Sequence, residues 1–446
     1  METATAQIPR STVPAKPELP PGPDWSVIRS TRRWWRRPLQ TLEECRARYG
    51  DVFTYRIAHE GTWVFLSDPA AIKQVFTGDP RLLHAGEANT VLLPVLGEHS
   101  VLLLDEPAHM KERKLMLPPF HGKRMQAYRE VMTEVAVAEI QRWPAEEPIR
   151  MRPHMQAMTL EIILRAVFGV GDGERLTRLR DQLRRTLNLI SDPRRALFLV
   201  MLGPERIRRF PPFRRHIDRV DRLLFDEIAA RRGASDLAER DDILSLLLQA
   251  EHEDGRALSD RELRDELMTL LVAGHETTAT ALSWAVELLA RHPAELDRLE
   301  TGVGAGSDDY LDAVIKETLR LRPVIALVLR KLVEPMEIGG RLLPAGASVA
   351  PSIYLVHRRP DIYPEPERFR PERFIEQPAG TYTWIPFGGG VRRCLGAAFA
   401  EFEMAVVLRE LVARRRLRPV GDPEHSVRST ITNVPNRGAE VMAAPR

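Results

Sequence analysis

A cysteine near the end of the chain stands in an unusual local setting. The segment Phe387 to Gly396 reads FGGGVRRCLG, so the thiol of Cys394 follows three glycines and two arginines. Glycines permit backbone paths that are closed to other residues. Nearby positive charge and the start of the helix that follows, AAFAEFEMAVVLREL, both favour a thiolate. The sequence therefore predicts a stable anionic sulfur at Cys394.

Four other interpretations of Cys394 need weighing. A free cysteine is often a buried, inert side chain, but the glycines and arginines argue against that. A structural zinc site needs about four ligands, and no other cysteine or histidine lies nearby in sequence. A phosphate-binding loop would need a glycine spacing that is absent here. A cysteine hydrolase that pairs Cys394 with a distant histidine stays open.

A second set of polar residues interrupts an apolar helical segment. The pattern LRDELMTLLVAGHETTATALSWAVELLAR follows a capping box at Ser259 and Glu262 and stops at Pro293, which predicts one helix roughly 50 Å long. In its middle, Ala273 to Thr278 combine small and polar residues, so we expect a local opening that holds water or a small ligand. A kink with satisfied polar groups is the simpler alternative. Because residue 279 is alanine, the segment is not an H-E-x-x-H zinc helix.

Two charged pairs at helical spacing complete the candidates. Glu317 and Arg320 share one helix face, and so do His109 and Arg113, which would suit an anionic group. Most such pairs are solvated surface contacts of little energetic value.

The composition predicts a globular protein of mainly helical structure. The chain has 446 residues, a formal charge of +3 and only two cysteines, which argues against a nucleic-acid partner and a disulfide framework. Without a long apolar run or an export signal, we expect a cytoplasmic protein. Short strands are predicted around the turns at Glu60–Gly61 and Gly339–Gly340. We expect a proline-rich arm over residues 1–24 and a single domain over residues 25–446.

Taken together, these motifs resemble the cytochrome P450 family. Phe387, Gly390, Arg392, Cys394 and Gly396 match its cysteine-loop signature F-x-x-G-x-R-x-C-x-G. The segment Ala273 to Thr277 is similar to the family's oxygen-activating helix motif, the segment from Glu317 to Arg320 matches E-x-x-R, and the segment from Pro371 to Phe374 resembles the element that supplies the third member of a core triad. The resemblance implies a mainly α fold with small β-sheets, in which one long helix crosses over a haem b group.

The resemblance also implies roles for individual residues. Cys394 would ligate the haem iron and donate electron density that assists O–O cleavage. Glu276 and Thr277 would manage protons and water at dioxygen, with Ala273 and Gly274 leaving room for it, and would be catalytic. Glu317, Arg320 and Arg373 would be structural. The residues expected to hold the cofactor are His109, Arg113, Arg330, Phe387, Arg392, Cys394 and Gly396.

The expected substrate pocket is apolar, which suggests a fatty acid, a terpenoid or a steroid-like molecule. The alternative is that the same side chains are simply core. The residues proposed to line the pocket are Met268, Ala273, Val324, Ile325, Leu327 and Val328, together with residues 84–104, 197–202 and 430–434.

The chain has no flavin, nicotinamide or iron–sulfur segment, so electrons would come from NAD(P)H through a separate reductase and ferredoxin. A basic face for that partner would consist of Lys111, Lys114, Arg393 and Arg414 to Arg416. The bases around Arg194, Arg195, Arg206, Arg208 and Arg209 would suit peripheral contact with a membrane.

The resulting hypothesis is a monooxygenase. Its rivals are a haem-binding sensor or carrier without turnover and a cysteine hydrolase without haem.

Overall fold

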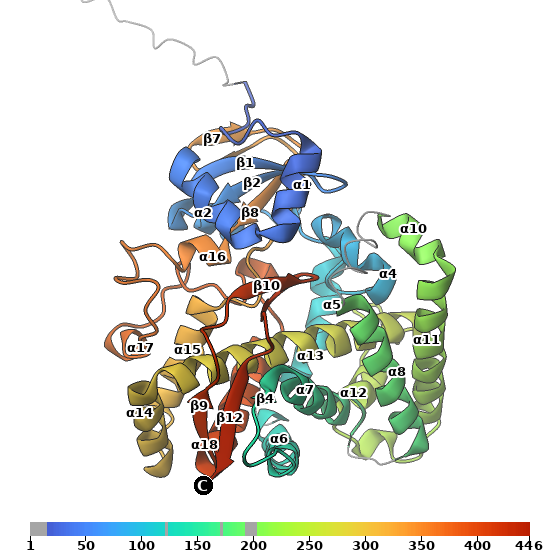
Figure 1. Cartoon of the computed structure of the whole chain (residues 1–446). Coiled ribbons are helices and arrows are strands. Elements are labelled where there is room, and N and C mark those ends of the chain that lie inside the picture. Colours follow the sequence, from blue (N-terminus) through green and yellow to red (C-terminus); the bar gives the residue numbers. More distant parts are fainter. Residues whose placement is uncertain (1–15, 121–123, 170–172, 192–202) are drawn as a thin grey trace, which may run out of the picture.

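The fold is organised around one long central helix. The computed structural model describes residues 16–120, 124–169, 173–191 and 203–446, and within it α13 (Asp260–Arg291) crosses the middle of the molecule (Figure 1). The predicted capping box is present, because the Ser259 side chain accepts from the Glu262 backbone and the Glu262 carboxylate accepts from Ser259. Residues 263–271 and 278–290 of α13 are buried, but the apolar sequence predicted burial of the middle of the helix as well, and there residues 272–274, 276 and 277 keep exposed surface.

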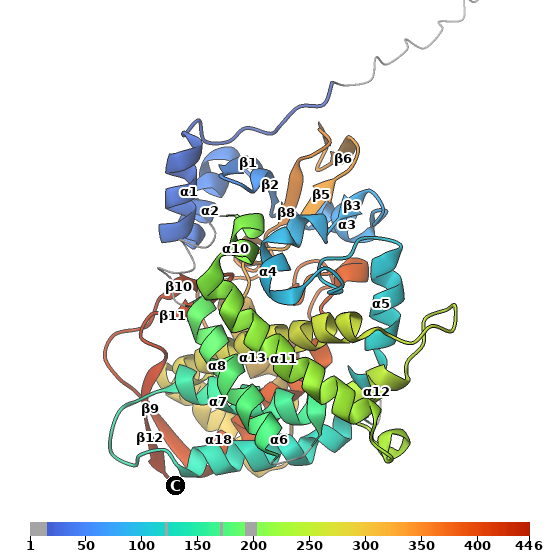
Figure 2. The ribbon, with the colours of Figure 1, turned by 90° about the vertical axis from the view of Figure 1, so that its right-hand side faces the viewer.

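Further helices surround α13 and share its core. Apolar side chains of α6, α7, α13 and α18 form one continuous cluster, and α8, α11 and α12 cover one side of the molecule (Figure 2). The helices are α1 (Val27–Arg36), α2 (Pro38–Tyr49), α3 (Pro69–Thr77), α4 (Leu93–Leu96), α5 (Ala108–Met116), α6 (Arg124–Gln141), α7 (Met151–Phe168), α8 (Glu174–Ser191), α10 (Pro204–Arg209), α11 (Pro211–Arg232), α12 (Ile243–Gln249), α14 (Pro293–Gly304), α15 (Asp309–Leu321), α16 (Ile353–Val356), α17 (Arg373–Glu376) and α18 (Ala397–Arg414).

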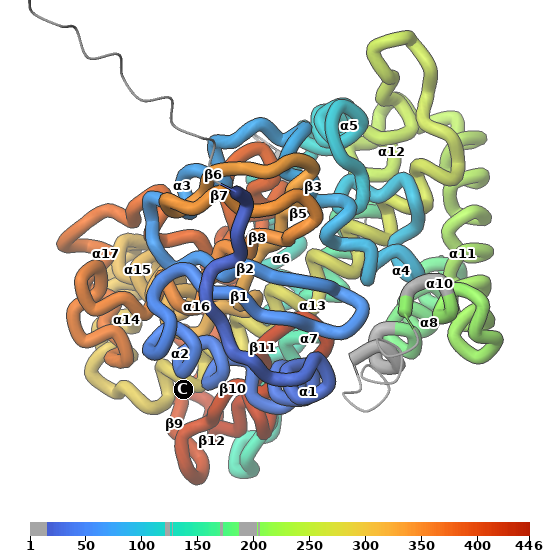
Figure 3. The backbone as a smooth tube through the Cα atoms, turned by 90° about the horizontal axis from the view of Figure 1, so that it is seen from above, coloured from blue at the N-terminus to red at the C-terminus, as the bar shows by residue number. Residues whose placement is uncertain are grey.

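The strands form small sheets at the edges of this helical body. A five-stranded sheet in the order β1-β2-β8-β5-β3 lies above α13, with α1 and α2 beside it (Figure 3). A three-stranded sheet has the order β4-β12-β9, and two hairpins join β6 to β7 and β10 to β11. The strands are β1 (Val52–Ile57), β2 (Gly61–Leu66), β3 (Leu83–His84), β4 (Ile149–Arg150), β5 (Arg330–Leu332), β6 (Met336–Ile338), β7 (Arg341–Leu343), β8 (Ser348–Pro351), β9 (Arg415–Pro419), β10 (Ser426–Ser429), β11 (Thr432–Pro435) and β12 (Glu440–Pro445).

Both predicted hairpins are present. Strands β1 and β2 pair antiparallel around residues 58–60, and β6 pairs with β7 across Gly339 and Gly340, which have φ angles of 59° and 71°. These left-handed conformations explain why the second turn needs glycine. The mainly helical fold class with small sheets is therefore confirmed.

The described part of the N-terminal segment packs on the large sheet. The carbonyl of Pro20 accepts a hydrogen bond from the Thr54 hydroxyl (2.7 Å), and the carbonyl of Pro21 accepts from the Thr54 backbone (3.0 Å). Among the residues that the structure describes, no helix is long and apolar enough to cross a membrane.

Candidate functional site

The cysteine loop has a backbone that only glycine fits. Gly388 and Gly390 have φ angles of 67° and 66°, and a Cβ atom on Gly389 would lie 2.2 Å from the Phe76 ring. The Cys394 backbone N–H donates to the Phe387 carbonyl (2.9 Å), which closes the loop just before α18 begins. The glycines therefore let the loop turn tightly against α3 while it presents Cys394.

Cys394 combines an accessible thiol with a desolvating environment. Its side chain retains exposed surface, although α5 and the start of α18 flank the loop that carries it. Desolvation by surrounding protein raises its pKa, and the Gly396 backbone N–H, Arg393 and Arg113 act in the opposite direction. The folded chain alone therefore favours the thiol over the predicted thiolate, and a bound metal ion would reverse this, since coordination deprotonates a thiol.

A cluster of arginines lies beside this loop. Arg113 donates to the Arg393 carbonyl (2.8 Å), and Arg392 pairs with Asp105 (3.0 Å). Arg330 is 7% exposed and donates only to the Leu329 carbonyl, without a carboxylate partner among the described residues. Burial lowers the pKa of Arg330 and that of Arg392 to about 10, and each is still charged near neutral pH.

His109 lies in the same cluster but is neutral near pH 7. Its Nδ1 lies 2.7 Å from Glu106, and the side chain is buried. Burial, followed by the charge of Arg392, lowers the pKa of His109 to about 4. Because Nδ1–H donates to the Glu106 carboxylate, Nε2 of the neutral ring is an acceptor, so His109 can donate to a further anion only when it is protonated.

The cluster has an excess of positive charge that suits an anionic ligand. Three guanidinium groups face two carboxylates, Asp105 and Glu106, and the buried Nε of Arg392 has no hydrogen-bond partner in the described structure. Buried charge is costly unless it is paired. The two propionates of a haem would supply the missing acceptors, so the residues present fit that group.

Glu317, Arg320 and Arg373 form a second charged cluster that is complete within the protein. Arg320 donates to both carboxylate oxygens of Glu317 (2.7 and 2.9 Å), and Arg373 donates to one of them (3.1 Å). Arg320 also donates to the carbonyls of His357 and Pro366, both at 2.8 Å. This pair is thus fully buried, unlike most pairs at this spacing, and it ties α15 to the segment before the cysteine loop.

The notch in α13 opens on one side. Ala273 is exposed although residues 263–271 and 278–290 on either side of the notch are buried, and the Thr277 hydroxyl donates to the Ala273 carbonyl (2.6 Å). The helix continues through the notch without interruption. The Thr277 hydroxyl bonds to the Ala273 carbonyl without displacing the helix's own backbone hydrogen bonds. Gly274 also lets α13 pack closely against α7, because a Cβ atom at this position would lie 3.3 Å from the Ile163 side chain.

Glu276 is held by two residues that the sequence did not indicate. Arg152 donates to one carboxylate oxygen (2.5 Å) and Gln156 to the other (2.7 Å), both from α7. These partners are more than 100 residues away along the chain, so no local pattern predicts them. The neighbouring His275 contacts Thr159 through Nδ1 (2.9 Å), and burial lowers its pKa to about 4.

Glu403 is another residue that the sequence analysis missed. It is 1% exposed on the α18 face toward the core, one carboxylate oxygen has no partner in the described structure, and burial raises its pKa well above the ordinary value despite a hydrogen bond with Thr278. A signal was available, because a carboxylate at a core position of the apolar helix AAFAEFEMAVVL breaks the expected pattern.

The predicted pocket residues differ in exposure. Ala273 is exposed, whereas Ile325, Leu327 and Val328 are half-buried. Met268 and Val324 are buried, with 1% and 8% of their surface exposed, and both belong to the core cluster. The predicted segment at residues 197–202 lies outside the described residues, as do Arg194 and Arg195.

One part of the predicted basic face is wrong. Arg415 is buried and donates to the carbonyls of Ile140, Trp143 and Ala443. The run Arg414 to Arg416 also lies at the far end of α18, roughly 27 Å along the helix from the cysteine loop. Lys111 and Arg393 are exposed beside that loop, and so is Lys114, which pairs with Glu253.

Known proteins are similar to this chain over most of its length. A family model described as Cytochrome P450 matches residues 17–440. A protein of Mycobacterium bovis with the provisional name cytochrome P450 135B1 is 47% identical, covering 95% of this chain and 91% of its own. One of Mycobacterium tuberculosis, provisionally named 135A1, is 41% identical and covers 96% of each chain.

Solved structures show the same fold. A cyanobacterial protein, CYP120A1, solved with retinoic acid bound, has a TM-score of 0.82 at 23% identity and covers 97% of this chain and 100% of its own. The haem domain of cytochrome P450DA has a TM-score of 0.80 at 24% identity, covering 96% and 98%.

Proposed function

Because the chain belongs to the cytochrome P450 family, whose members are haem-thiolate monooxygenases, we propose that it inserts one oxygen atom of dioxygen into a lipophilic molecule. The observation that carries the proposal is the pairing of an accessible Cys394 thiol with an uncompensated arginine cluster. The substrate class would be a fatty acid, a terpenoid or a steroid-like compound. Hydroxylation and epoxidation are the reactions that we expect.

The residues that would hold the haem come from three parts of the chain. Cys394 would bind the haem iron, with Phe387 and Gly396 shaping the loop around it. Arg113, Arg330 and Arg392 would pair with the propionates, and His109, which donates to Glu106 in this structure, would donate to a propionate only when protonated. When bound, the haem supplies the redox chemistry of oxygen activation.

Proton supply would fall to α13 and its neighbours. The Thr277 hydroxyl donates to Ala273 in this structure, so it must rotate before it can donate a proton into the notch. Glu276 must likewise exchange its bonds to Arg152 and Gln156 before it can pass a proton on. Glu403 would be a proton store on the core side, linked to Thr278 next to Thr277.

Electrons would come from NAD(P)H through a reductase and a ferredoxin, which we place with this enzyme in the cytoplasm. Arg393 supports this, because it is an exposed base within the cysteine loop, and Lys111 and Lys114 are exposed on α5, where Lys114 pairs with Glu253. Peripheral contact with a membrane would involve Arg206, Arg208 and Arg209 on α10. These predicted residues lie within the described part of the chain, and all three are exposed.

The visible spectrum of the reduced protein with carbon monoxide tests the proposal. A strongly red-shifted Soret band would support thiolate ligation through Cys394, and a Cys394→Ala variant should lose that band. A colourless protein that fails to take up haem would overturn the proposal and favour the cysteine hydrolase. A haem sensor would give the band but would form no oxygenated product when electrons and lipophilic compounds are supplied.

A further inference from the structure

A cleft of about 670 Å³ lies at the N-terminal end of α13. Its walls come from α11, from the end of α10 and from the loop around α4. Arg261 on α13 lines the cleft. It precedes Ala273 by twelve residues, so the two positions are roughly 18 Å apart along the helix. A cavity of this size falls in the range of small-molecule sites.

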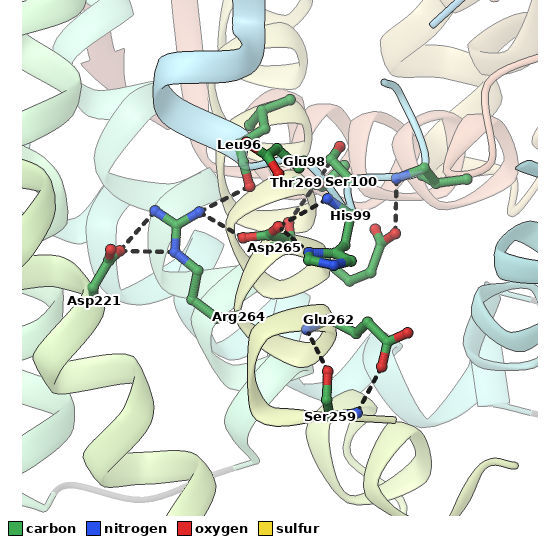
Figure 4. Close-up of polar contacts among 12 residues, drawn as sticks. Leu96, Glu98, His99, Ser100, Asp221, Ser259, Glu262, Arg264, Asp265 and Thr269 are labelled. Atoms are coloured by element: carbon green, nitrogen blue, oxygen red, sulfur yellow. Dashed lines mark hydrogen bonds and ion pairs between the residues drawn. The ribbon is translucent and has the colours of Figure 1, made fainter. Parts of the chain in front are cut away.

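The floor of the cleft is a closed set of ionic contacts (Figure 4). Arg264, which is 6% exposed, pairs with Asp221 (2.6 Å) and Asp265 (2.9 Å) and donates to the Leu96 carbonyl (2.8 Å). Asp265 also accepts from the backbone N–H of His99 (2.9 Å). These groups satisfy one another, so the floor requires no ligand.

The mouth of the cleft is different, because its unpaired charges are all positive. Glu98 pairs with Arg208 (2.9 Å) and Asp218 with Arg214 (3.6 Å), so all four lining carboxylates, including the two in the floor, are engaged. Arg209 and Arg261 line the cleft without a carboxylate partner among the residues described.

The remaining wall is apolar. Phe213, Ile217 and Phe225 line the cleft from α11 and Leu93 and Pro94 from α4; Leu93 and Phe225 are half-buried and the other three are buried. A ligand that satisfies both the arginines and these side chains has an anionic head and an apolar body. Guanidinium groups match carboxylate geometry particularly well.

We propose that this cleft is a second binding site, for a lipophilic carboxylate held by Arg209 and Arg261. Its position on α13 separates it from the notch where oxygen insertion is proposed. The inference does not depend on turnover, because it concerns binding alone. A bound molecule here would bridge α11 and α13 across the mouth.

Calorimetric titration of the haem-loaded protein tests the site, with decanoate as the probe and decan-1-ol as its neutral match. We expect the double variant Arg209→Glu, Arg261→Glu to lose about tenfold or more in decanoate affinity, because two attractive charges become repulsive. The control is Arg215→Glu, Arg219→Glu, two exposed arginines on α11 that do not line the cleft. Its decanoate affinity should stay within twofold of the parent.

Location is tested separately from affinity. A photoreactive diazirine decanoate should label peptides that contain residues 213–225, and Arg209→Glu, Arg261→Glu should abolish that label while the response of the Soret band to decanoate is unchanged. Equal affinities in the two double variants would overturn the proposal. So would equal binding of decan-1-ol, or a label confined to the segments around Ala273 and Cys394.

Discussion

Two buried arginine clusters lie on either side of the segment that leads to Cys394, and they differ in how their charge is balanced. In the first, Glu317 accepts from both Arg320 and Arg373, and the remaining donors of Arg320 reach backbone carbonyls. In the second, Arg330 has no carboxylate partner in the described structure. The charges of the first cluster are therefore balanced within the folded protein, whereas those of the second cluster are balanced only when an anion is bound.

The cleft at the start of α13 repeats this contrast on a smaller scale. Its floor pairs Arg264 with Asp221 and Asp265, while Arg209 and Arg261 at its mouth lack carboxylate partners among the described residues. A balanced cluster mainly contributes to folding, because removing one member leaves a buried charge uncompensated. An unbalanced cluster mainly contributes to binding. The two kinds of cluster should thus respond to mutation in opposite ways.

The largest effect is expected from the balanced cluster. Glu317→Ala would leave Arg320 and Arg373 buried without their shared carboxylate, which should destabilise the fold by about 3–5 kcal/mol. Denaturant unfolding of the haem-loaded protein measures this. The control Glu365→Ala removes the partner of an exposed arginine, Arg368, and should change stability by less than about 0.5 kcal/mol. Equal losses in the two variants would contradict the comparison.

Arg330→Met should have a smaller effect of a different kind. Removing an unpaired buried charge should leave the apoprotein at least as stable as the parent, while haem retention weakens by about 1.5–3 kcal/mol because a charged hydrogen bond is lost. The rate of haem transfer to apomyoglobin measures retention. The neighbouring Lys331→Met is the control, since Lys331 pairs with Glu87 at the surface. A destabilised apoprotein with normal haem retention would place Arg330 with the structural cluster instead.

Much of the fold could be predicted because its strongest signals are local. The capping box at Ser259 and the glycines of the turn at 339–340 are short-range features, and each forms as predicted. The cysteine loop was equally visible, since its glycines and arginines are contiguous. Spacing could not reveal burial, however. Glu317 and Arg320 look like any surface pair until the chain around His357 and Pro366 encloses them.

The less predictable part of the site depends on contacts between distant segments. Arg152 and Gln156 reach Glu276 only because α7 packs along α13, and Asp105 reaches Arg392 across nearly 300 residues. The same limit explains the error at Arg415, whose charge pattern resembled a surface run. In the structure, carbonyls from α6 and β12 surround its guanidinium group instead.

Glu112 extends the comparison to an unbalanced negative charge. It is 5% exposed, its Oε1 has no partner in the described structure, and burial, followed by the charge of Glu262, raises its pKa to about 7, while His99 and Arg256 lower it. On the facing helix, burial likewise raises the pKa of Glu266 well above its ordinary value, and the charge of Glu112 adds to that shift. The folded form therefore holds the Glu112 proton more tightly than the unfolded chain.

Stability should consequently fall as the pH rises from about 4.5 to about 7 through ionisation of Glu112. Glu112→Gln removes that ionisation, so its stability relative to the parent should improve by about 1–2 kcal/mol between pH 4.5 and pH 8. Denaturant midpoints across this range measure the difference. Exposed Glu130→Gln is the control and should show no such trend. A parallel pH profile for parent and Glu112→Gln would mean that Glu112 is compensated by a partner.

Thr277→Ala should have the smallest effect on stability and a selective effect on chemistry. The hydroxyl bonds only to the Ala273 carbonyl, which already belongs to the helix, so the loss should be below about 0.5 kcal/mol. If Thr277 supplies protons in the notch, however, electron consumption should continue while product per electron falls and hydrogen peroxide accumulates. Thr277→Ser, which keeps the hydroxyl, should restore most of the coupling. Unchanged coupling in Thr277→Ala would assign proton delivery to another group, and Glu403, which already contacts Thr278, would be the next residue to replace.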